Sequence, residues 1–141
     1  DNMNILVIDA QGGGIGRQLV AKLLERIPEA DIVAAGTNSM ATNAMIKAGA
    51  KKAATGENAI RYCASQAEII TGPIGILVAN AMLGEISPAI AESVGSSTAP
   101  KVLIPTAHCN TIIAGTKALP VKDSIEDAVD RIVRIHGGED N

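Results

Sequence analysis

The start of the chain carries the pattern that most limits what it can fold into. An apolar run, Asn4-Ile5-Leu6-Val7-Ile8, leads through Asp9 into the glycine cluster Gly12-Gly13-Gly14-Ile15-Gly16. Apolar residues then recur at the spacing of one helix face, at Ile15, Leu19, Val20, Leu23, Leu24 and Ile27. This order is typical of a phosphate-binding junction, because glycine lets a ligand approach the backbone and the helix start offers unpaired N–H groups. The pattern predicts an anion site without indicating a reaction.

Segments typical of strands alternate with segments typical of helices along the rest of the chain. We expect strands at residues 4–8, 31–35, 51–54, 68–71, 101–104 and 112–114. We expect helices at residues 16–27, 39–48, 58–65 and 88–94, and a last helix with Ile125, Ala128, Val129, Ile132 and Val133 on one face. Residues 74–83 allow two interpretations, a strand at 74–79 or a short buried helix at 76–83.

This alternation predicts an α/β fold, because the connections between parallel strands place helices on both faces of a sheet. We expect one Rossmann-like domain of three layers, with a mostly parallel sheet in the strand order 3-2-1-4-5-6. It spans residues 1–141, the length of one domain, and its 47% hydrophobic content suffices for one core. Asp1 and Asn2 precede Met3 and are expected to be an added remnant outside the fold, and residues 137–141 a flexible tail.

The composition argues against several functional classes. The formal net charge is −3 and the aromatic content is a single tyrosine, Tyr62, so we expect neither the basic field nor the stacking surfaces of a nucleic-acid-binding protein. No apolar run approaches the roughly 20 residues that cross a bilayer, and no secretory leader is recognised, so we expect no membrane partner and a cytoplasmic location. Cys63 and Cys109 lie far apart and are expected to be reduced thiols, and we expect no metal site.

The glycine cluster matches no standard dinucleotide pattern completely. It does not fit the spacing of G-x-G-x-x-G. It is closer to the T-G-x-x-x-G-I-G loop of short-chain dehydrogenases, in which Gly14-Ile15-Gly16 match while Asp9 and Ala10 replace the first two residues. The catalytic Y-x-x-x-K pair of those enzymes is absent, since Tyr62 is followed by Cys63-Ala64-Ser65-Gln66, and we therefore reject that chemistry.

The candidate ligand-binding residues follow the carboxyl ends of the predicted strands, where parallel sheets bind their ligands. They are Asp9, Gln11, Gly12, Gly13, Gly14, Ile15, Gly16, Thr37, Asn38, Glu57, Gly72, Pro73, Gly75 and His108. The second strand ends in the neutral Gly36-Thr37-Asn38-Ser39, where a dinucleotide site has an acid for a ribose hydroxyl. A simpler interpretation of the glycines stays open, namely that they only permit a tight turn and close packing of helix on strand.

Asp9 and the pair His108-Cys109 raise separate chemical questions. We expect Asp9 to accept hydrogen bonds from N–H groups of the loop, which takes those donors away from a ligand. The alternative is an Asp9 carboxylate that holds a Mg²⁺ accompanying a phosphate. His108 beside Cys109 suggests a thiolate and its base, yet adjacent residues of an extended segment point in opposite directions. We expect a buried thiol or a polar loop there, and assign no catalytic residue.

Several segments together resemble one bacterial protein family. They are residues 4–16, Gly36-Thr37-Asn38, residues 54–58, Gly72-Pro73-Ile74-Gly75-Ile76 and Leu83-Gly84-Glu85-Ile86. They resemble an uncharacterised family of short Rossmann-like proteins, a domain of unknown function, over nearly the whole chain. Members of that family typically have Gly where this chain has Ala10. The resemblance implies the fold and brings no assigned activity.

The leading functional hypothesis is a protein that binds a small anionic ligand at the glycine loop. A nucleotide or a phosphorylated metabolite is expected there, and the cofactor is otherwise unknown. One alternative is a non-catalytic interaction module with a vestigial glycine loop. Another is an enzyme that depends on Cys109.

A homodimer is the assembly that we expect. Met40, Met45, Met82 and Leu83 sit among small residues such as Ala44, Ala79 and Ala81. Flat, alanine-rich faces allow close approach of a second copy, and twofold dimers are the commonest assembly. In the alternative interpretation these residues line the monomer's own core.

Overall fold

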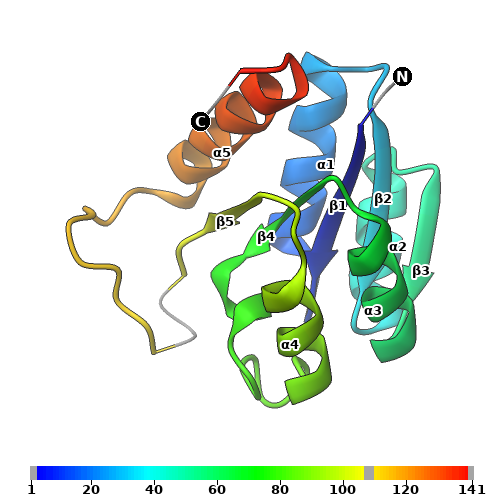
Figure 1. The fold of residues 1–141 in the computed structure, drawn as a ribbon, viewed down its shortest axis with the longest axis vertical. Coiled ribbons are helices and arrows are strands. Elements are labelled where there is room, and N and C mark those ends of the chain that lie inside the picture. Colours follow the sequence, from blue (N-terminus) through cyan, green and yellow to red (C-terminus); the bar gives the residue numbers. More distant parts are fainter. Residues whose placement is uncertain (1–2, 107–109, 140–141) are drawn as a thin grey trace.

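The chain folds around one parallel sheet of five strands (Figure 1). The computed structural model describes residues 3–106 and 110–139. The strands are β1 (Asn4–Asp9), β2 (Asp31–Gly36), β3 (Lys52–Thr55), β4 (Ile69–Pro73) and β5 (Lys101–Ile104), in the order β3-β2-β1-β4-β5. Every neighbouring pair is parallel. The order reverses between β1 and β4, and ligands of such sheets bind at the crevice where this happens.

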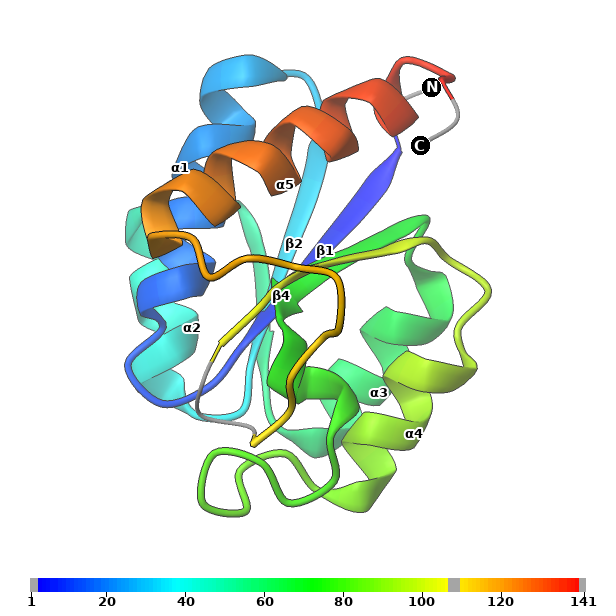
Figure 2. The same cartoon turned by 90° about the vertical axis from the view of Figure 1, so that its left-hand side faces the viewer.

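Helices cover both faces of the sheet, as the alternation of elements predicts. They are α1 (Gly14–Arg26), α2 (Ser39–Lys47), α3 (Glu57–Gln66), α4 (Pro88–Ser96) and α5 (Val121–His136). Figure 2 shows α1, α2 and α5 on one side of the sheet and α3 and α4 on the other. The prediction of a single Rossmann-like α/β domain of three layers is therefore confirmed.

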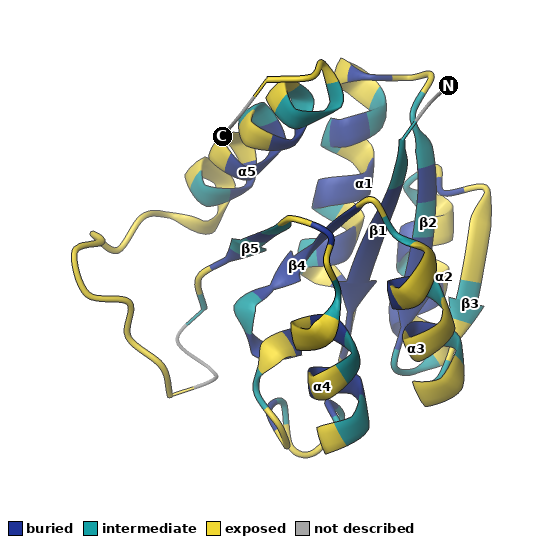
Figure 3. Ribbon diagram, in the orientation of Figure 1, coloured by how far each residue is buried: buried dark blue, intermediate teal, exposed yellow. Residues whose placement is uncertain are grey.

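Strand β1 lies at the centre of the core, and its residues after Asn4 are all buried (Figure 3). Ile5 and Val7 pack towards α1 and α5, while Leu6 and Ile8 pack towards α3 and α4. Successive side chains point to opposite faces and both faces are buried, which explains why the middle of this strand is a continuous apolar run. Helix α1 contributes the stripe expected from its periodicity, with Leu19, Leu23 and Ile27 all buried.

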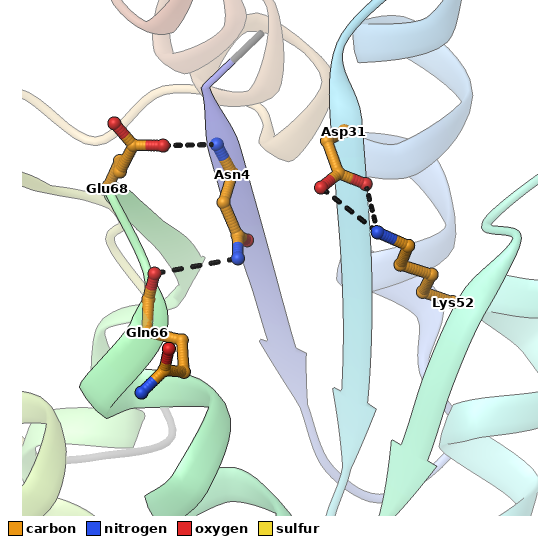
Figure 4. Close-up of polar contacts among 5 residues, drawn as sticks. All are labelled: Asn4, Asp31, Lys52, Gln66 and Glu68. Carbon is orange, nitrogen blue, oxygen red and sulfur yellow. Dashed lines mark hydrogen bonds and ion pairs between the residues drawn. The ribbon is translucent and has the colours of Figure 1, made fainter. Parts of the chain in front are cut away.

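Polar contacts tie the strands together at the amino edge of the sheet, opposite the glycine loop (Figure 4). The backbone N–H of Asn4 donates to Oε1 of Glu68 at 3.0 Å, and the Asn4 side-chain amide donates to the carbonyl of Gln66 at 3.5 Å. Lys52 Nζ pairs with Asp31 Oδ1 at 3.1 Å and so links β3 to β2. These contacts stabilise the amino edge of the sheet, whereas ligands of parallel sheets bind at the opposite, carboxyl edge.

The predicted strand at residues 112–114 is wrong. These residues form no strand, and the sheet ends at β5. Ile112 is 95% exposed and pairs with no strand of the described part of the chain. β-Branched residues favour a strand only where they pair with a neighbouring strand and pack against a surface, and within the described residues Ile112 does neither.

Residues 74–83 form neither the strand nor the helix that their sequence allowed. A single 3₁₀ turn covers η1 (Ile74–Leu77), and turns follow as far as Glu85. Asn80, Met82 and Leu83 all have positive φ angles, which neither a strand nor a right-handed helix accommodates. The segment consequently folds back over the carboxyl edge of the sheet.

The methionine–alanine faces divide between core and surface. Met45 is fully buried against the core on the α1 and α5 side, so its predicted place in a dimer face is wrong. Met40 is 68% exposed and Leu83 is 98% exposed. Among the residues described, no helix has both the length and the apolar character needed to cross a membrane.

Candidate functional site

The glycine loop passes from β1 into α1 through a left-handed residue. Gly13 has φ 73° and precedes the first turn of α1, and its N–H donates to the carbonyl of Ala10 at 3.1 Å. A Cβ at Gly13 would lie 2.9 Å from Cα of Ala41. Part of the simpler interpretation therefore holds, since Gly13 is required for the turn and for packing against α2.

Asp9 closes the inner side of this loop. Its Oδ1 accepts from the N–H of Ala10 at 2.8 Å, and its Oδ2 accepts from the N–H of Gly16 at 2.6 Å. The prediction that Asp9 binds N–H groups of the loop is confirmed. Burial raises the pKa of the Asp9 carboxyl, the two hydrogen bonds oppose this, and the nearby charge of Glu85 raises it further. The N–H of Gly16 therefore already donates to a carboxylate of the protein itself and is not free for a ligand.

Glu85 closes the outer side of the loop, and sequence analysis did not include it among the candidates. Its Oε1 accepts from the N–H of Gln11 at 2.9 Å, from the hydroxyl of Thr37 at 2.7 Å and from the side-chain amide of Asn38 at 2.9 Å. Partial burial acts to raise the pKa of the Glu85 carboxyl. The three hydrogen bonds together have the larger effect, so the pKa lies below its ordinary value. Glu85 thus supplies a carboxylate at the end of β2, where the local sequence is neutral.

Asn38 joins the glycine loop to the start of α2. Its Oδ1 accepts from the N–H of Ala41 at 2.9 Å and caps the helix, while its Nδ2 donates to the carbonyl of Gln11 at 3.1 Å. The N-termini of α1 and α2 are therefore held beside each other. Helix N-termini carry partial positive charge, which the carboxylates of Asp9 and Glu85 offset on the side of the glycine loop.

A hollow of about 530 Å³ opens beside Gly12 at this region. Its wall includes Gly12, Arg17, Ser39, Asn43 and Lys47. No acidic side chain lines it among the residues described, and within those residues neither Arg17 nor Lys47 forms an ion pair. The position of a Cβ at Gly12 has no atom within 4 Å, so the backbone faces open space there. Two unpaired cations beside accessible backbone form a surface suited to an anion.

Other candidate residues lie apart from this hollow. The Glu57 carboxylate accepts a hydrogen bond from the hydroxyl of Ser87, which links the starts of α3 and α4. Gly72 allows β4 to lie close to β1, since a Cβ there would lie 2.3 Å from the carbonyl oxygen of Ile8. Pro73 ends β4 and Gly75 lies in the following 3₁₀ turn.

His108 and Cys109 lie outside the residues that the structure describes, so the predictions made for them stay predictions. Across residues 3–106 and 110–139, no three His, Cys, Asp or Glu side chains gather closely enough to hold a metal ion.

Comparison with protein families assigns the chain a family. The model of a family described as "Domain of unknown function (DUF3842)" matches residues 4–137. The chain belongs to this family. The expected resemblance to an uncharacterised Rossmann-like family is thereby confirmed. A search of curated proteins finds no match to this DUF3842 sequence.

Solved structures place the DUF3842 fold among known α/β proteins. The dodecameric FMN-dependent UbiX-like decarboxylase from Escherichia coli O157:H7 is similar with a TM-score of 0.51 and 16% identity, over 96% of this chain and 95% of that one. A universal stress protein in complex with cAMP is similar with a TM-score of 0.42 and 14% identity, over 74% of this chain and 98% of that one. At such identity the likeness to the decarboxylase describes the fold alone.

Proposed function

We propose that the protein binds a phosphate-bearing small molecule, a nucleotide or a phosphorylated metabolite, in the hollow beside Gly12. The observation that carries the proposal is the pair Arg17 and Lys47. Both cations line the hollow, and neither has an ion-pair partner within the described residues. A guanidinium can engage two phosphate oxygens at once, and a lysine ammonium adds a point charge.

The ligand's phosphate lies outside the glycine loop rather than within it. Asp9 already accepts from the N–H of Gly16, and Glu85 already accepts from the N–H of Gln11. An anion placed at those amides would lie against two carboxylates, which Coulomb repulsion disfavours. The side facing Gly12, Ser39 and Asn43 has donors and cations without these acids. The two internal carboxylates therefore hold the loop in shape while the hollow receives the phosphate.

The proposal is tested by thermal unfolding with a panel of nucleotides and phosphorylated metabolites, followed with a reporter dye. A ligand present at a hundred times its Kd adds about 2.7 kcal/mol to the free energy of unfolding and raises the melting temperature. Arg17→Gln and Lys47→Gln are expected to reduce that rise. Gly12→Val is expected to abolish it while the protein still folds, because Gly12 lines the hollow and no atom lies within 4 Å of a Cβ there.

Arg61→Gln and Lys51→Gln are the matched controls, because both side chains are exposed and neither lines the hollow. They are expected to respond to ligand as the wild type does. The proposed site is wrong if no member of the panel shifts the melting temperature. It is also wrong if the controls lose the shift as fully as Arg17→Gln does. The interaction module with a vestigial loop would then be the better hypothesis.

A further inference from the structure

We propose that the ligand carries a second anionic group, which lies between α1, α2 and α5 at Lys22 and Lys122. This inference rests on the proposed function, because it extends the same ligand from the hollow beside Gly12. It specifies the chemical class as a molecule with two separated phosphates or other strong anions and an uncharged middle.

The groove that would receive the second group has walls from three helices. It has a volume of about 380 Å³, and Arg17, Lys22, Lys47 and Lys122 all line it. The chain has 12 Lys and Arg against 15 Asp and Glu, so a third of its cations face one groove in an acidic protein. No Asp or Glu is among the described residues of the lining. Repulsion among these cations is relieved when an anion binds.

Most of these cations have no internal counterion. Lys22 Nζ lies 3.7 Å from Oε2 of Glu25, an exposed pair that contributes little. In the described parts of the chain, Arg17, Lys47 and Lys122 form no ion pair. By contrast, Arg26 of the same helix is paired with Asp130 of α5. The groove therefore concentrates cations that the fold itself does not neutralise.

The groove and the hollow beside Gly12 are adjoining parts of one depression. Arg17, Ala44 and Lys47 line both. Helices α1 and α2 form the shared walls, and Figure 2 shows α5 crossing the same side of the sheet. A ligand anchored by one phosphate at Arg17 and Lys47 can therefore extend towards α5 without leaving the surface.

The spacing along α1 indicates that the two anionic groups are separated rather than adjacent. Lys22 follows Arg17 by five positions on α1, which corresponds to about 7.5 Å along the helix axis. Small apolar side chains, Ala21 and Ala48, line the groove together with Ile125 of α5. They offer no partner to a charged group, so the part of the ligand between its two anions is uncharged and compact.

Calorimetry with matched probes tests the inference on the full chain. The probes are fructose 1,6-bisphosphate against fructose 6-phosphate, and adenosine 3′,5′-bisphosphate against adenosine 5′-monophosphate. We expect at least one bisphosphate to bind about tenfold more tightly than its monophosphate, or more. Lys22→Gln and Lys122→Gln should remove most of that difference and leave the affinity for the monophosphate unchanged. Lys51→Gln, which lines neither part of the depression, should change neither affinity.

The outcomes separate this inference from the proposed function. One outcome is that monophosphates bind through Arg17 and Lys47 and that bisphosphates bind no more tightly. This result would overturn the second anionic group at Lys22 and Lys122 and leave the proposed phosphate site beside Gly12 intact. Equal weakening of both probe types by Lys22→Gln would also overturn it, since a general effect of charge would explain the result. Failure of every probe to bind would overturn the proposed function and this inference together. Circular dichroism of each variant ensures that loss of binding is not loss of fold.

Discussion

The carboxylate of Glu85 accepts a hydrogen bond of 2.9 Å from the backbone N–H of Gln11, a residue 74 positions earlier in the chain. Gln11 belongs to the glycine loop and has a positive φ of 50°. Glu85 ends the turns that follow β4, so this single contact ties that segment to the loop after β1. The carboxylate of Glu85 thus connects the loops that follow β1 and β4, the two strands between which the strand order reverses.

Replacing Glu85 with Gln is expected to destabilise the protein by about 1 kcal/mol, since a neutral oxygen accepts the same hydrogen bonds more weakly than a carboxylate. Urea unfolding at pH 7 measures the change in the free energy of unfolding. Glu92→Gln, an exposed position on α4, serves as the control and should stay within about 0.5 kcal/mol of the wild type.

The effect of Glu85→Gln should also depend on pH. Because the folded-state pKa of Glu85 is lowered, its contribution to stability is present above the ordinary pKa of about 4.3 and is lost as the pH falls through the folded-state value. The wild type and the variant should therefore become equally stable at low pH. A difference that stays constant down to that range would mean that the charge of Glu85 is not responsible.

Asp9 should show the opposite pH dependence. Burial raises its folded-state pKa, so the folded protein holds the proton more tightly than the unfolded chain. The contribution of Asp9 is therefore greatest below its ordinary pKa and is lost as the pH rises through the raised value. Relative to Asp9→Asn, the wild type should gain stability on acidification. Chemical unfolding of both proteins between about pH 3 and pH 7, a range that starts below the ordinary Asp pKa of about 3.9 and extends well above it, gives the sign. A relative loss on acidification would show that the ionised form is the favoured one.

Leu23→Ala should lower the free energy of unfolding by about 2–5 kcal/mol, because the side chain is fully buried beneath α1. Leu119→Ala is the matched control, since Leu119 is 55% exposed and its truncation should cost under about 0.5 kcal/mol. Thermal and urea unfolding both report the change. If the two substitutions cost the same, the apolar stripe of α1 does not face the core.

The fold could be predicted from the sequence wherever local pattern and burial agree. The helical spacing of Leu19 and Leu23 indicated which face of α1 is buried, and the apolar run at residues 4–8 indicated a central strand. The segment at 112–114 has the same local character but no strand beside it. Pairing is a tertiary property, so a short apolar run alone could not distinguish an edge strand from an exposed segment.

The candidate site was predictable only in its local part. Asp9 lies next to the glycine loop in sequence, and its role as an acceptor of N–H groups followed from that position. Glu85 accepts a hydrogen bond from Thr37, which lies 48 residues earlier in the chain. Arg17 and Lys47 line the same hollow only because α1 and α2 pack together. No spacing rule in a single sequence indicates such contacts, since they depend on how the loops fold over the sheet.

Gly16→Ala is expected to destabilise the protein by about 1–3 kcal/mol, the usual effect of overpacking. A Cβ at Gly16 would lie 2.7 Å from Sδ of Met45 and 2.9 Å from Cβ of Asp9. Gly12→Ala should cost much less, because nothing lies within 4 Å of its Cβ position. Urea unfolding compares the two. Similar losses for both would show that glycine serves backbone flexibility in this loop rather than close packing at Gly16.

Assembly is expected to be a homodimer that covers exposed apolar side chains near the carboxyl edge of the sheet. Leu83 is 98% exposed and Met40 is 68% exposed, whereas Met45 is taken into the core. Large apolar side chains exposed to this degree favour a partner surface when they gather in one region. Sedimentation at micromolar concentration should give twice the chain mass of 14.4 kDa, and Leu83→Asp should shift the protein towards the monomer. Lys51→Gln, at an exposed position, is the control because it makes the same change in net charge as Leu83→Asp. A wild-type species of 14.4 kDa alone would rule out the dimer, and a dimer indifferent to Leu83→Asp would place its interface elsewhere.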